Sequence, residues 1–237
     1  MIDGKKVGVI IPAAGKGKRM GNTKSKQFLE VAGKPIIVRT LEHFQNSPEV
    51  DIILVASNRN DLELLTELVK QYNLTKVGSV IEGGAERQDS VWNGLQAMAK
   101  EKVELVMIHD AVRPFISQQM IKKILQATLK DSVAILAVRP KDTIKKSSNA
   151  DYADETLDRE RLWITQTPQA FKFSLIHKAF EKAYCDGFYG TDDASLIERI
   201  GMKVRIVEGT YDNIKITTTD DIELAQSIVK RFVTKDN

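Results

Sequence analysis

The sequence has little cysteine, few aromatic residues and almost no excess charge, and each shortage excludes a class of protein. Cys185 is the only cysteine among 237 residues, so neither an internal disulfide nor a cysteine metal cluster is expected. Lysine and arginine exceed aspartate and glutamate by only 35 − 32 = 3, which is too few for a dedicated nucleic-acid-binding protein. Aromatic residues make up 6% of the chain and none lies in its basic loop, which argues against base stacking there.

Long apolar runs and targeting segments are also missing. No segment reaches the roughly 20 apolar residues of a membrane-spanning helix, and no signal peptide is recognisable. We therefore expect a cytoplasmic protein without a membrane partner. The three histidines lack metal-ligand spacing, so a zinc site is not expected. The length fits one large α/β domain, which we expect to span residues 1–237.

A basic loop containing two glycines organises the N-terminal part of the chain. The apolar run from Val7 to Ile11, followed by the sequence PAAGKGKRM, indicates a buried strand that ends in a tight loop. Gly15 and Gly17 allow a ligand to lie against the main chain. Exposed amides and nearby cations then form a cradle for anionic oxygens, which predicts a polyphosphate ligand. The cations within reach are Lys16, Lys18, Arg19, Lys24 and Lys26.

Two better-known phosphate loops do not fit this sequence. The dinucleotide pattern G-x-G-x-x-G requires a third glycine where Met20 stands, which disfavours a dinucleotide-dependent oxidoreductase. The P-loop pattern fits neither Gly15 nor Gly17. A solvated basic turn, or a nucleotide-binding module without catalysis, remains the alternative for the loop taken alone.

Apolar runs and helical patterns alternate along most of the chain. This alternation predicts an α/β fold with a doubly wound, mainly parallel sheet. Because ligands bind beyond the carboxyl ends of such strands, the loops beginning at Pro12, Glu82 and His109 should converge. Strands are expected at 51–56, 76–81, 104–110, 133–138, 203–207 and 213–216, and helices at 35–44, 61–72, 88–99, 117–129, 174–185 and 220–232, with a further helix capped by Thr191 and Asp192.

The segment from 141 to about 163 interrupts this alternation. It is highly charged, and its apolar residues Ile144, Tyr152 and Leu157 are too sparse to bury a core of their own. The segment is therefore expected to be a flexible insertion or an arm that packs on another subunit.

Polar residues at the predicted strand ends could carry chemistry. Asp110 ends an apolar run and is placed to hold Mg²⁺ between phosphate oxygens, and Arg113 could clamp a second phosphate. Lys215 could flank an α-phosphate together with Lys26 and neutralise charge during an in-line displacement. Taken singly, Asp110 could equally be a turn residue paired with an arginine, and Lys215 an exposed strand lysine.

A second glycine turn, Gly83–Gly84, precedes the predicted helix at 88–99. Asp89 and Ser90 follow this turn and could simply cap the helix. Alternatively, the polar and backbone groups of the turn could recognise a nucleobase or ribose.

Nine segments, in order and spanning nearly the whole chain, resemble the 2-C-methyl-D-erythritol 4-phosphate cytidylyltransferase family of the non-mevalonate isoprenoid pathway. They are PAAGKGKRM (12–20), KQF (26–28), GGAERQDSV (83–91), HDAVRPF (109–115), KDTIK (141–145), LDRERLW (157–163), QTPQAF (166–171), TDDASLIE (191–198) and DNIKIT (212–217). The resemblance implies a Rossmann-like nucleotidyltransferase that uses Mg²⁺ to transfer CMP from CTP to a polyol phosphate.

The resemblance also implies roles for individual residues. The implied catalytic cations are Arg19, Lys26 and Lys215. The implied nucleotide contacts are Pro12, Ala13, Ala14, Gly15, Lys16, Gly17, Gly84 and Ser90. The implied residues of the sugar-phosphate site are Asp110, which also serves the metal, Arg113, Thr143, Arg159, Thr167 and Thr191.

Two further implications concern assembly and substrate. Thr143 and Arg159 lie on the segment that forms an arm in this family and reaches the neighbour's site, which implies a homodimer with arm exchange. Ala85 departs from the family, because many members carry an acidic residue there, and this change could loosen selectivity for CTP. A sister family, ribitol-5-phosphate cytidylyltransferase, shares several of the segments but tends to have AGG in place of AAG and to lack TD-x-AS. The sequence AAG at 13–15 and the segment DDAS at 192–195 therefore favour the erythritol substrate.

Overall fold

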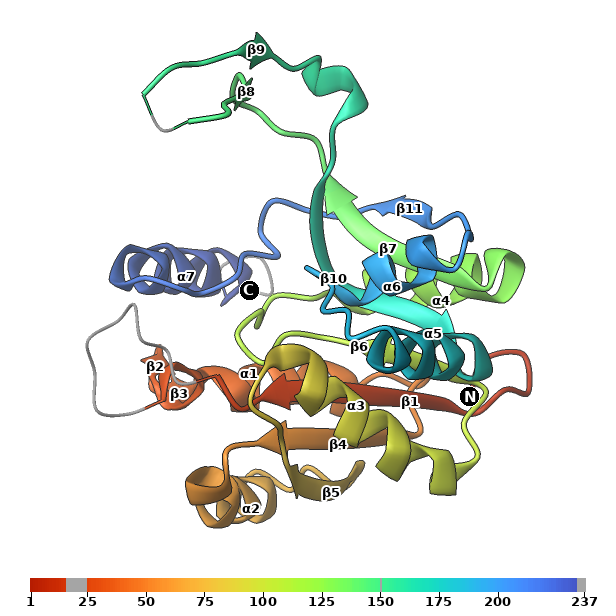
Figure 1. Cartoon of the computed structure of the whole chain (residues 1–237). Helices are drawn as coiled ribbons and strands as arrows, with labels where there is room; N and C mark the ends of the chain where they lie inside the picture. The colour runs from red at the N-terminus through yellow and green to blue at the C-terminus, as the bar shows by residue number, and fades with distance from the viewer. Residues whose placement is uncertain (16–24, 150, 234–237) are drawn as a thin grey trace.

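The computed structural model describes residues 1–15, 25–149 and 151–233. In this part of the chain, seven strands form one sheet in the order β11-β7-β10-β6-β1-β4-β5, with helices on both faces (Figure 1). Neighbouring strands are parallel except where β10 pairs with β6 and with β7. The predicted doubly wound, mainly parallel α/β fold is confirmed.

The bounds of the elements agree with the sequence patterns over most of the chain. The strands of the large sheet are β1 (Val7–Ala13), β4 (Ile52–Ser57), β5 (Val77–Glu82), β6 (Leu105–Ile108), β7 (Val133–Val138), β10 (Ile164–Lys172) and β11 (Arg205–Glu208). The α-helices are α1 (Ile36–Gln45), α2 (Leu62–Gln71), α3 (Arg87–Met98), α4 (Gln118–Asp131), α5 (Phe173–Cys185), α6 (Asp193–Arg199) and α7 (Thr219–Val233). Short strand pairs are β2 (Glu30–Val31) with β3 (Lys34–Pro35), and β8 (Lys145–Lys146) with β9 (Glu155–Thr156).

The central strand β1 contributes to a core on each side of the sheet. Successive side chains of a strand point to opposite faces, so Val9 and Ile11 pack with α1, α2 and α4, whereas Ile10 packs with α3, α5 and α6. Gly94 lets α3 lie close to β1, because a Cβ at this position would come within 2.7 Å of the Ile10 side chain. This close approach brings the N-terminus of α3 to the carboxyl end of β1, where the predicted loop begins.

Two segments differ from the sequence expectations. Residues Ile164–Lys172 form the antiparallel strand β10, which the polar and proline-containing sequence ITQTPQAFK did not indicate. The prediction of a strand at 213–216 was wrong, because this segment is irregular. Its polar groups bond to side chains and loops instead of a strand partner: Arg113 donates to the Asn213 carbonyl, and Ile216 donates to the Val112 carbonyl. The predicted cap before α6 is confirmed, because the Asp192 side chain accepts from the Ser195 N–H.

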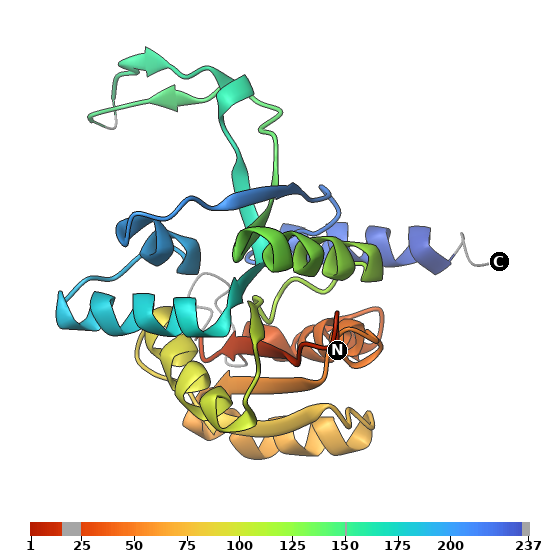
Figure 2. The same ribbon diagram turned by 90° about the vertical axis from the view of Figure 1, so that its right-hand side faces the viewer.

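The segment between β7 and β10 projects from the body of the molecule and carries the β8–β9 pair, as both views show (Figure 1, Figure 2). Two cation–aromatic contacts lie where this segment leaves the body. The Arg139 guanidinium is 3.9 Å from the ring centre of Trp163, and the Lys141 ammonium is 3.9 Å from that of Tyr211. Among the described residues, no helix combines the length and apolar character needed to cross a membrane.

Candidate active site

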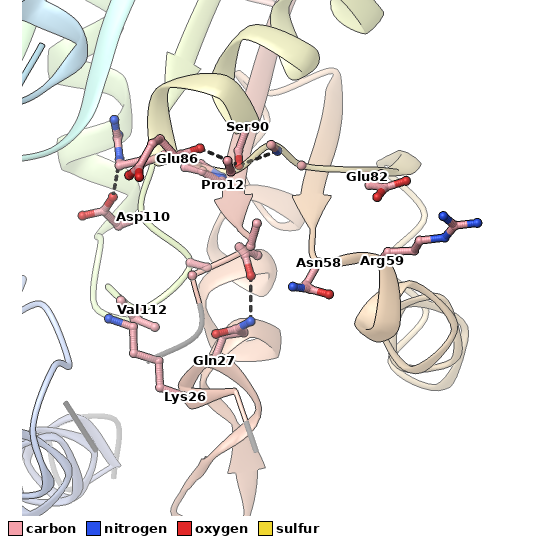
Figure 3. Close-up of a pocket in the computed structure, with 18 of the residues that line it drawn as sticks. Pro12, Lys26, Gln27, Asn58, Arg59, Glu82, Glu86, Ser90, Asp110 and Val112 are labelled. Atoms are coloured by element: carbon pink, nitrogen blue, oxygen red, sulfur yellow. Dashed lines mark hydrogen bonds and ion pairs between the residues drawn. The ribbon is translucent and has the colours of Figure 1, made fainter. Parts of the chain in front are cut away.

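A cavity of about 770 Å³ lies at the carboxyl ends of β1, β4, β5 and β6 (Figure 3). The loops that were expected to converge do meet here, because Pro12, Glu82 and Asp110 all line this cavity. Nine of the residues proposed from the sequence line it: Pro12, Ala13, Ala14, Gly15, Lys26, Gly84, Ser90, Asp110 and Lys215. Lys16, Gly17 and Arg19, which were also proposed, lie outside the described residues.

On one side of the cavity, the end of β1 is tied to the segment that carries Lys26. The amide of Gln27 donates to the carbonyl of Ala13 at 2.6 Å. Gln27 is almost fully buried, so this bond holds the 3₁₀ turn Lys26–Phe28 against the start of the glycine-containing loop. Lys26 is thereby kept on the cavity wall.

The Gly83–Gly84 turn forms the opposite wall. The Ser90 hydroxyl accepts from the Gly84 N–H and donates to the Glu86 carbonyl, at 3.1 Å each (Figure 3). Glu86 and Asp89 form the capping box of α3, so the cap predicted from Asp89 is confirmed, while Ser90 fixes the turn itself. Gly84 has to be glycine, because a Cβ there would lie 2.2 Å from the Cβ of Asp89.

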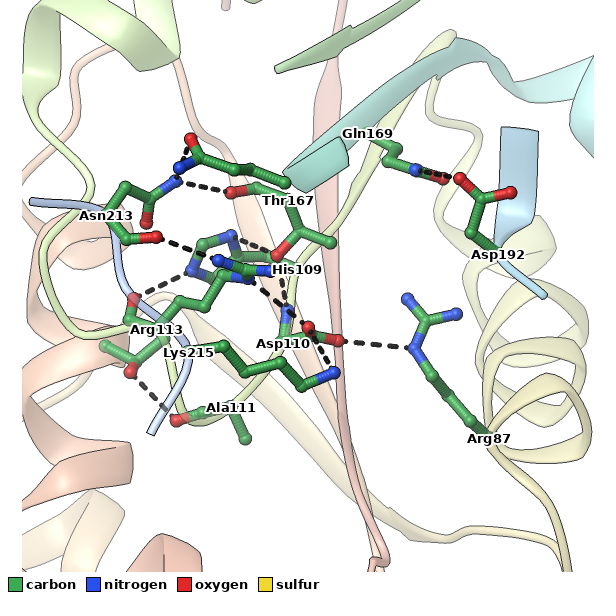
Figure 4. Close-up of polar contacts among 12 residues, drawn as sticks. Arg87, His109, Asp110, Ala111, Arg113, Thr167, Gln169, Asp192, Asn213 and Lys215 are labelled. Atoms are coloured by element: carbon green, nitrogen blue, oxygen red, sulfur yellow. Dashed lines mark hydrogen bonds and ion pairs between the residues drawn. The ribbon is translucent and has the colours of Figure 1, made fainter. Parts of the chain in front are cut away.

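Asp110 is the anionic centre of the site, and cations from three parts of the chain surround it (Figure 4). Its carboxylate lies 2.9 Å from the Lys215 ammonium, 3.2 Å from Arg87 Nε and 3.4 Å from Arg113 Nε. Burial alone would raise the pKa of Asp110, but the charges of Arg87, Lys215 and Arg113 hold this pKa well below its ordinary value. Asp110 is therefore ionised. Lys215 is 39% exposed, as the alternative interpretation expected, but it lies outside any strand and its ion pair with Asp110 holds it on the cavity wall.

Arg87 is a residue of the site that the sequence reasoning missed. Its two terminal nitrogens donate to the carboxylate of Asp193 at 3.0 and 2.7 Å, while its Nε bonds to Asp110. Burial opposes the charge of Arg87, but Asp193 and Asp110 raise its pKa further above the ordinary value. The available signal was the position of Arg87, three residues after Gly84. Nothing in the sequence indicated its pairing with the distant Asp193.

Behind Asp110, His109 and Thr167 form a buried hydrogen-bonded chain (Figure 4). Nε2 of His109 lies 3.0 Å from the Arg113 carbonyl, which can only accept, so Nε2 carries the proton. Nδ1 then accepts from the Thr167 hydroxyl at 3.1 Å, and the same hydroxyl oxygen accepts from the Asp110 N–H at 3.0 Å. The chain fixes the backbone of Asp110 and requires a neutral imidazole.

This buried imidazole predicts a pH-dependent stability. Burial lowers the pKa of His109 to about 3, and burial also lowers the pKa of His43. As the pH falls below about 6.5, the unfolded chain takes up protons that the folded chain cannot, so the free energy of unfolding decreases. From pH 6.5 to 4.5 we expect a loss of about 2 kcal/mol from His109.

Urea unfolding at a series of pH values measures this loss. The variant His109→Gln should show a shallower dependence on pH over the same range, although it is less stable at pH 7. An unchanged slope in His109→Gln would contradict the neutral, buried state of His109.

The remaining residues proposed from the sequence occupy three places. Arg113 and Thr167 are buried beside Asp110 and do not face the cavity. Thr191 lies on a second cavity of about 590 Å³, which Glu86 and Arg87 also line. Thr143 and Arg159 lie on the projecting segment, outside both cavities; Arg159 donates to the Lys141 carbonyl.

The chain is similar to known proteins over nearly its whole length. The family model of 2-C-methyl-D-erythritol 4-phosphate cytidylyltransferase matches residues 7–231. The chain is 44% identical over 227 residues to the enzyme of that name from Syntrophus aciditrophicus, covering 95% of this chain and 97% of the relative. It is 47% identical over 220 residues to the one from Geobacillus kaustophilus, covering 93% and 95%.

Solved structures give the same result. The 4-diphosphocytidyl-2C-methyl-D-erythritol synthase of Anaerococcus prevotii matches with a TM-score of 0.86 and 34% identity, covering 96% of this chain and all of the other. The cytidylyltransferase of Francisella tularensis matches with a TM-score of 0.79 and 35% identity, covering 94% and 99%. The resemblance found in the nine sequence segments is thus confirmed, and the chain belongs to the 2-C-methyl-D-erythritol 4-phosphate cytidylyltransferase family.

Proposed function

We propose that this chain transfers CMP from CTP to 2-C-methyl-D-erythritol 4-phosphate and releases pyrophosphate, as a nucleotidyltransferase of isoprenoid biosynthesis. The observation that carries this proposal is the placement of Lys215 against Asp110, 2.9 Å apart, on the wall of a cavity that the glycine-containing loop also lines. Membership of the family supports the choice of both substrates.

The proposed reaction is an in-line displacement. A phosphate oxygen of the polyol phosphate forms a bond to the α-phosphorus of CTP, while the bond to the bridging oxygen of the β-phosphate breaks and pyrophosphate leaves with that electron pair. The nucleophile is already an anion, so no general base is needed. The chain supplies alignment and positive charge, and we assign the charge to Arg19, Lys26 and Lys215.

We assign the other residues of the site to one or the other of the two substrates. We assign the triphosphate to Pro12, Ala13, Ala14, Gly15, Lys16 and Gly17, and the cytidine to Gly84 and Ser90. We assign the polyol phosphate to Asp110 and Thr191, and to Arg113 and Thr167, which are buried beside Asp110 and do not line the cavity. Because the Thr167 hydroxyl is bonded to His109 and to the Asp110 N–H, Thr167 would serve this site chiefly by holding Asp110 in place.

A divalent cation fits the same cavity. The described residues contain no group of three or more carboxylate, histidine or cysteine side chains that could hold a metal by themselves. Mg²⁺ at nucleotide sites is commonly held by one or two carboxylates together with phosphate oxygens, and the ionised Asp110 supplies one such carboxylate. When bound, Mg²⁺ would be held in part by Asp110 and would offset the negative charge of the phosphates.

We further propose a homodimer in which each projecting segment serves the partner's site. Thr143 and Arg159 lie on this segment, away from the cavity of their own chain, so they would contact the polyol phosphate held by the other subunit. Sedimentation measurements in the presence of CTP test the assembly, and a monomer under these conditions would exclude arm exchange.

Pyrophosphate release tests the function directly. With CTP and Mg²⁺, we expect release with methylerythritol phosphate and little release with ribitol 5-phosphate. Preference for ribitol 5-phosphate would keep the fold and the cations but reassign the substrate. No release with either acceptor would reduce the cavity to a nucleotide-binding site without catalysis.

A further inference from the structure

Two tyrosines outside the main cavity donate hydrogen bonds to Asp89, the residue against which Gly84 packs. Oδ1 of Asp89, in the first turn of α3, accepts from the Tyr184 hydroxyl at 2.7 Å and from the Tyr189 hydroxyl at 3.0 Å. Tyr184 lies in the last turn of α5, and Tyr189 lies in the loop between α5 and α6. Helix α5 runs beside α3 in both views (Figure 1, Figure 2), so the bonds join neighbouring elements.

Asp89 sets the position of the turn through direct packing. Its other oxygen accepts from the Glu86 N–H at 2.9 Å, which closes the capping box, so all parts of this carboxylate are engaged. Gly84 rests against Asp89 so closely that a Cβ on Gly84 would meet the backbone carbonyl carbon of Asp89 at 3.1 Å. The next residue, Ser90, accepts from the Gly84 N–H. A shift of Asp89 therefore displaces Gly84.

Tyr189 also belongs to the second cavity. Tyr189, Gly190 and Thr191 line that cavity together with Glu86 and Arg87. Gln88 docks the same loop on α3, because its side chain accepts from the Gly190 N–H at 2.8 Å and donates to the Phe188 carbonyl at 3.0 Å. The loop that carries Thr191 and the turn that carries Gly84 are therefore joined through the start of α3.

The turn has few side-chain groups of its own with which to read a base. Gly83 and Gly84 have none, and Ala85 adds only a methyl group. Cytosine and uracil differ at C4, where one presents an amino donor and the other a carbonyl acceptor. If backbone groups of this turn read that difference, discrimination depends on holding them within a few tenths of an ångström.

We propose that Tyr184 and Tyr189 are positioning residues that set the preference of the enzyme for CTP over UTP by fixing the Gly83–Gly84 turn through Asp89. This inference deepens the proposed function and rests on its assignment of the cytidine to this turn. It extends the site to α5 and its following loop, whose two tyrosines do not line the main cavity.

The test removes only the two hydroxyl groups. Tyr184→Phe, Tyr189→Phe and the double variant keep both rings, including the Tyr184 ring 5.7 Å from that of Trp92. Tyr72→Phe, at the end of α2, is the matched control. Pyrophosphate release gives kcat and KM for CTP and for UTP, and titration of each nucleotide without acceptor gives its affinity.

In the double variant we expect the ratio of kcat/KM for CTP to that for UTP to fall at least about tenfold, since hydrogen bonds to a charged group are lost. The loss should appear mainly as a higher KM for CTP, with kcat within about threefold of the unmutated value. In each single variant the ratio should fall less, because one tyrosine hydroxyl still donates to Asp89. A merely unstable variant would lose activity with both nucleotides equally and leave the ratio unchanged.

The outcomes separate this inference from the proposed function. If the unmutated chain is active and the double variant keeps its ratio and its affinity for CTP, the inference is overturned and the function stands. If the unmutated chain releases no pyrophosphate but binds CTP more tightly than UTP, and the double variant loses that preference, the function fails and the inference is supported.

Discussion

Replacing Lys215 by alanine should lower kcat by about 10²- to 10³-fold, the usual effect of removing one preorganised group that stabilises charge in a transition state. Lys215 lines the cavity and its ammonium is held 2.9 Å from Asp110, so the charge is already in place before CTP arrives. Its contribution should therefore grow as charge develops on the phosphorus centre. KM for CTP should change much less than kcat.

The fold should tolerate this change. Asp110 keeps its ion pairs with Arg87 and Arg113, and the Lys215 side chain is 39% exposed, so the lost pair stabilises the protein by no more than about 1 kcal/mol. Lys203→Ala, which removes an exposed lysine before β11, is the matched control and should keep full activity. A near-normal kcat in Lys215→Ala, measured by pyrophosphate release, would exclude Lys215 as a catalytic cation. The same comparison applies to Lys26→Ala.

Replacing Asp110 by asparagine should also lower kcat, by at least about 10²-fold, but it should not weaken the binding of CTP in the absence of a metal. Asparagine keeps the shape of the side chain and removes the charge that orients Lys215 and Arg113 and that is available to a divalent cation. Without a metal, the cavity then carries one negative charge fewer beside a polyphosphate. Affinity for CTP in the presence of a chelator should therefore be unchanged or higher, while turnover with Mg²⁺ falls.

The stability of Asp110→Asn should fall as well. Removing one partner of a buried ion pair typically costs about 3–5 kcal/mol, and a smaller cost is expected here because Arg87 and Lys215 are 33% and 39% exposed. Calorimetric titration with CTP and urea unfolding measure the two effects. Asp131→Asn, which removes a surface partner of Arg205, is the matched control. Weaker binding of CTP without metal, together with normal turnover, would contradict the role proposed for Asp110.

Much of the fold was predictable because parallel strands are buried on both faces. The runs that form β1, β4, β6 and β7 are nearly continuous in apolar residues, and helical patterns separate them. Strand β10 escaped prediction because its sequence is polar and contains Pro168. Its antiparallel place between β6 and β7 depends on partners distant in the chain.

The contacts around Asp110 were also not predictable from local sequence, because they join residues that are distant in the chain. Lys215 was selected from its sequence context, but the reason it matters is the irregular path of the segment at 213–216, where Asn213 bonds to the Thr167 carbonyl and to Arg113. A regular strand was expected there. Arg87 and Asp193 were missed because nothing in either local sequence indicates that the half-buried Arg87 and the buried Asp193 will meet.

The sequence by itself determined the family, the class of fold and the glycine-containing loop, because local apolar patterns and short motifs depend on neighbouring residues. Only the tertiary structure decided which charges surround Asp110, which tyrosines stand behind the Gly83–Gly84 turn, and that Thr143 and Arg159 lie apart from their own chain's cavity. These contacts join residues from separate elements. The packing of helices on both faces of the sheet sets the distances between these residues, and local sequence patterns do not predict those distances.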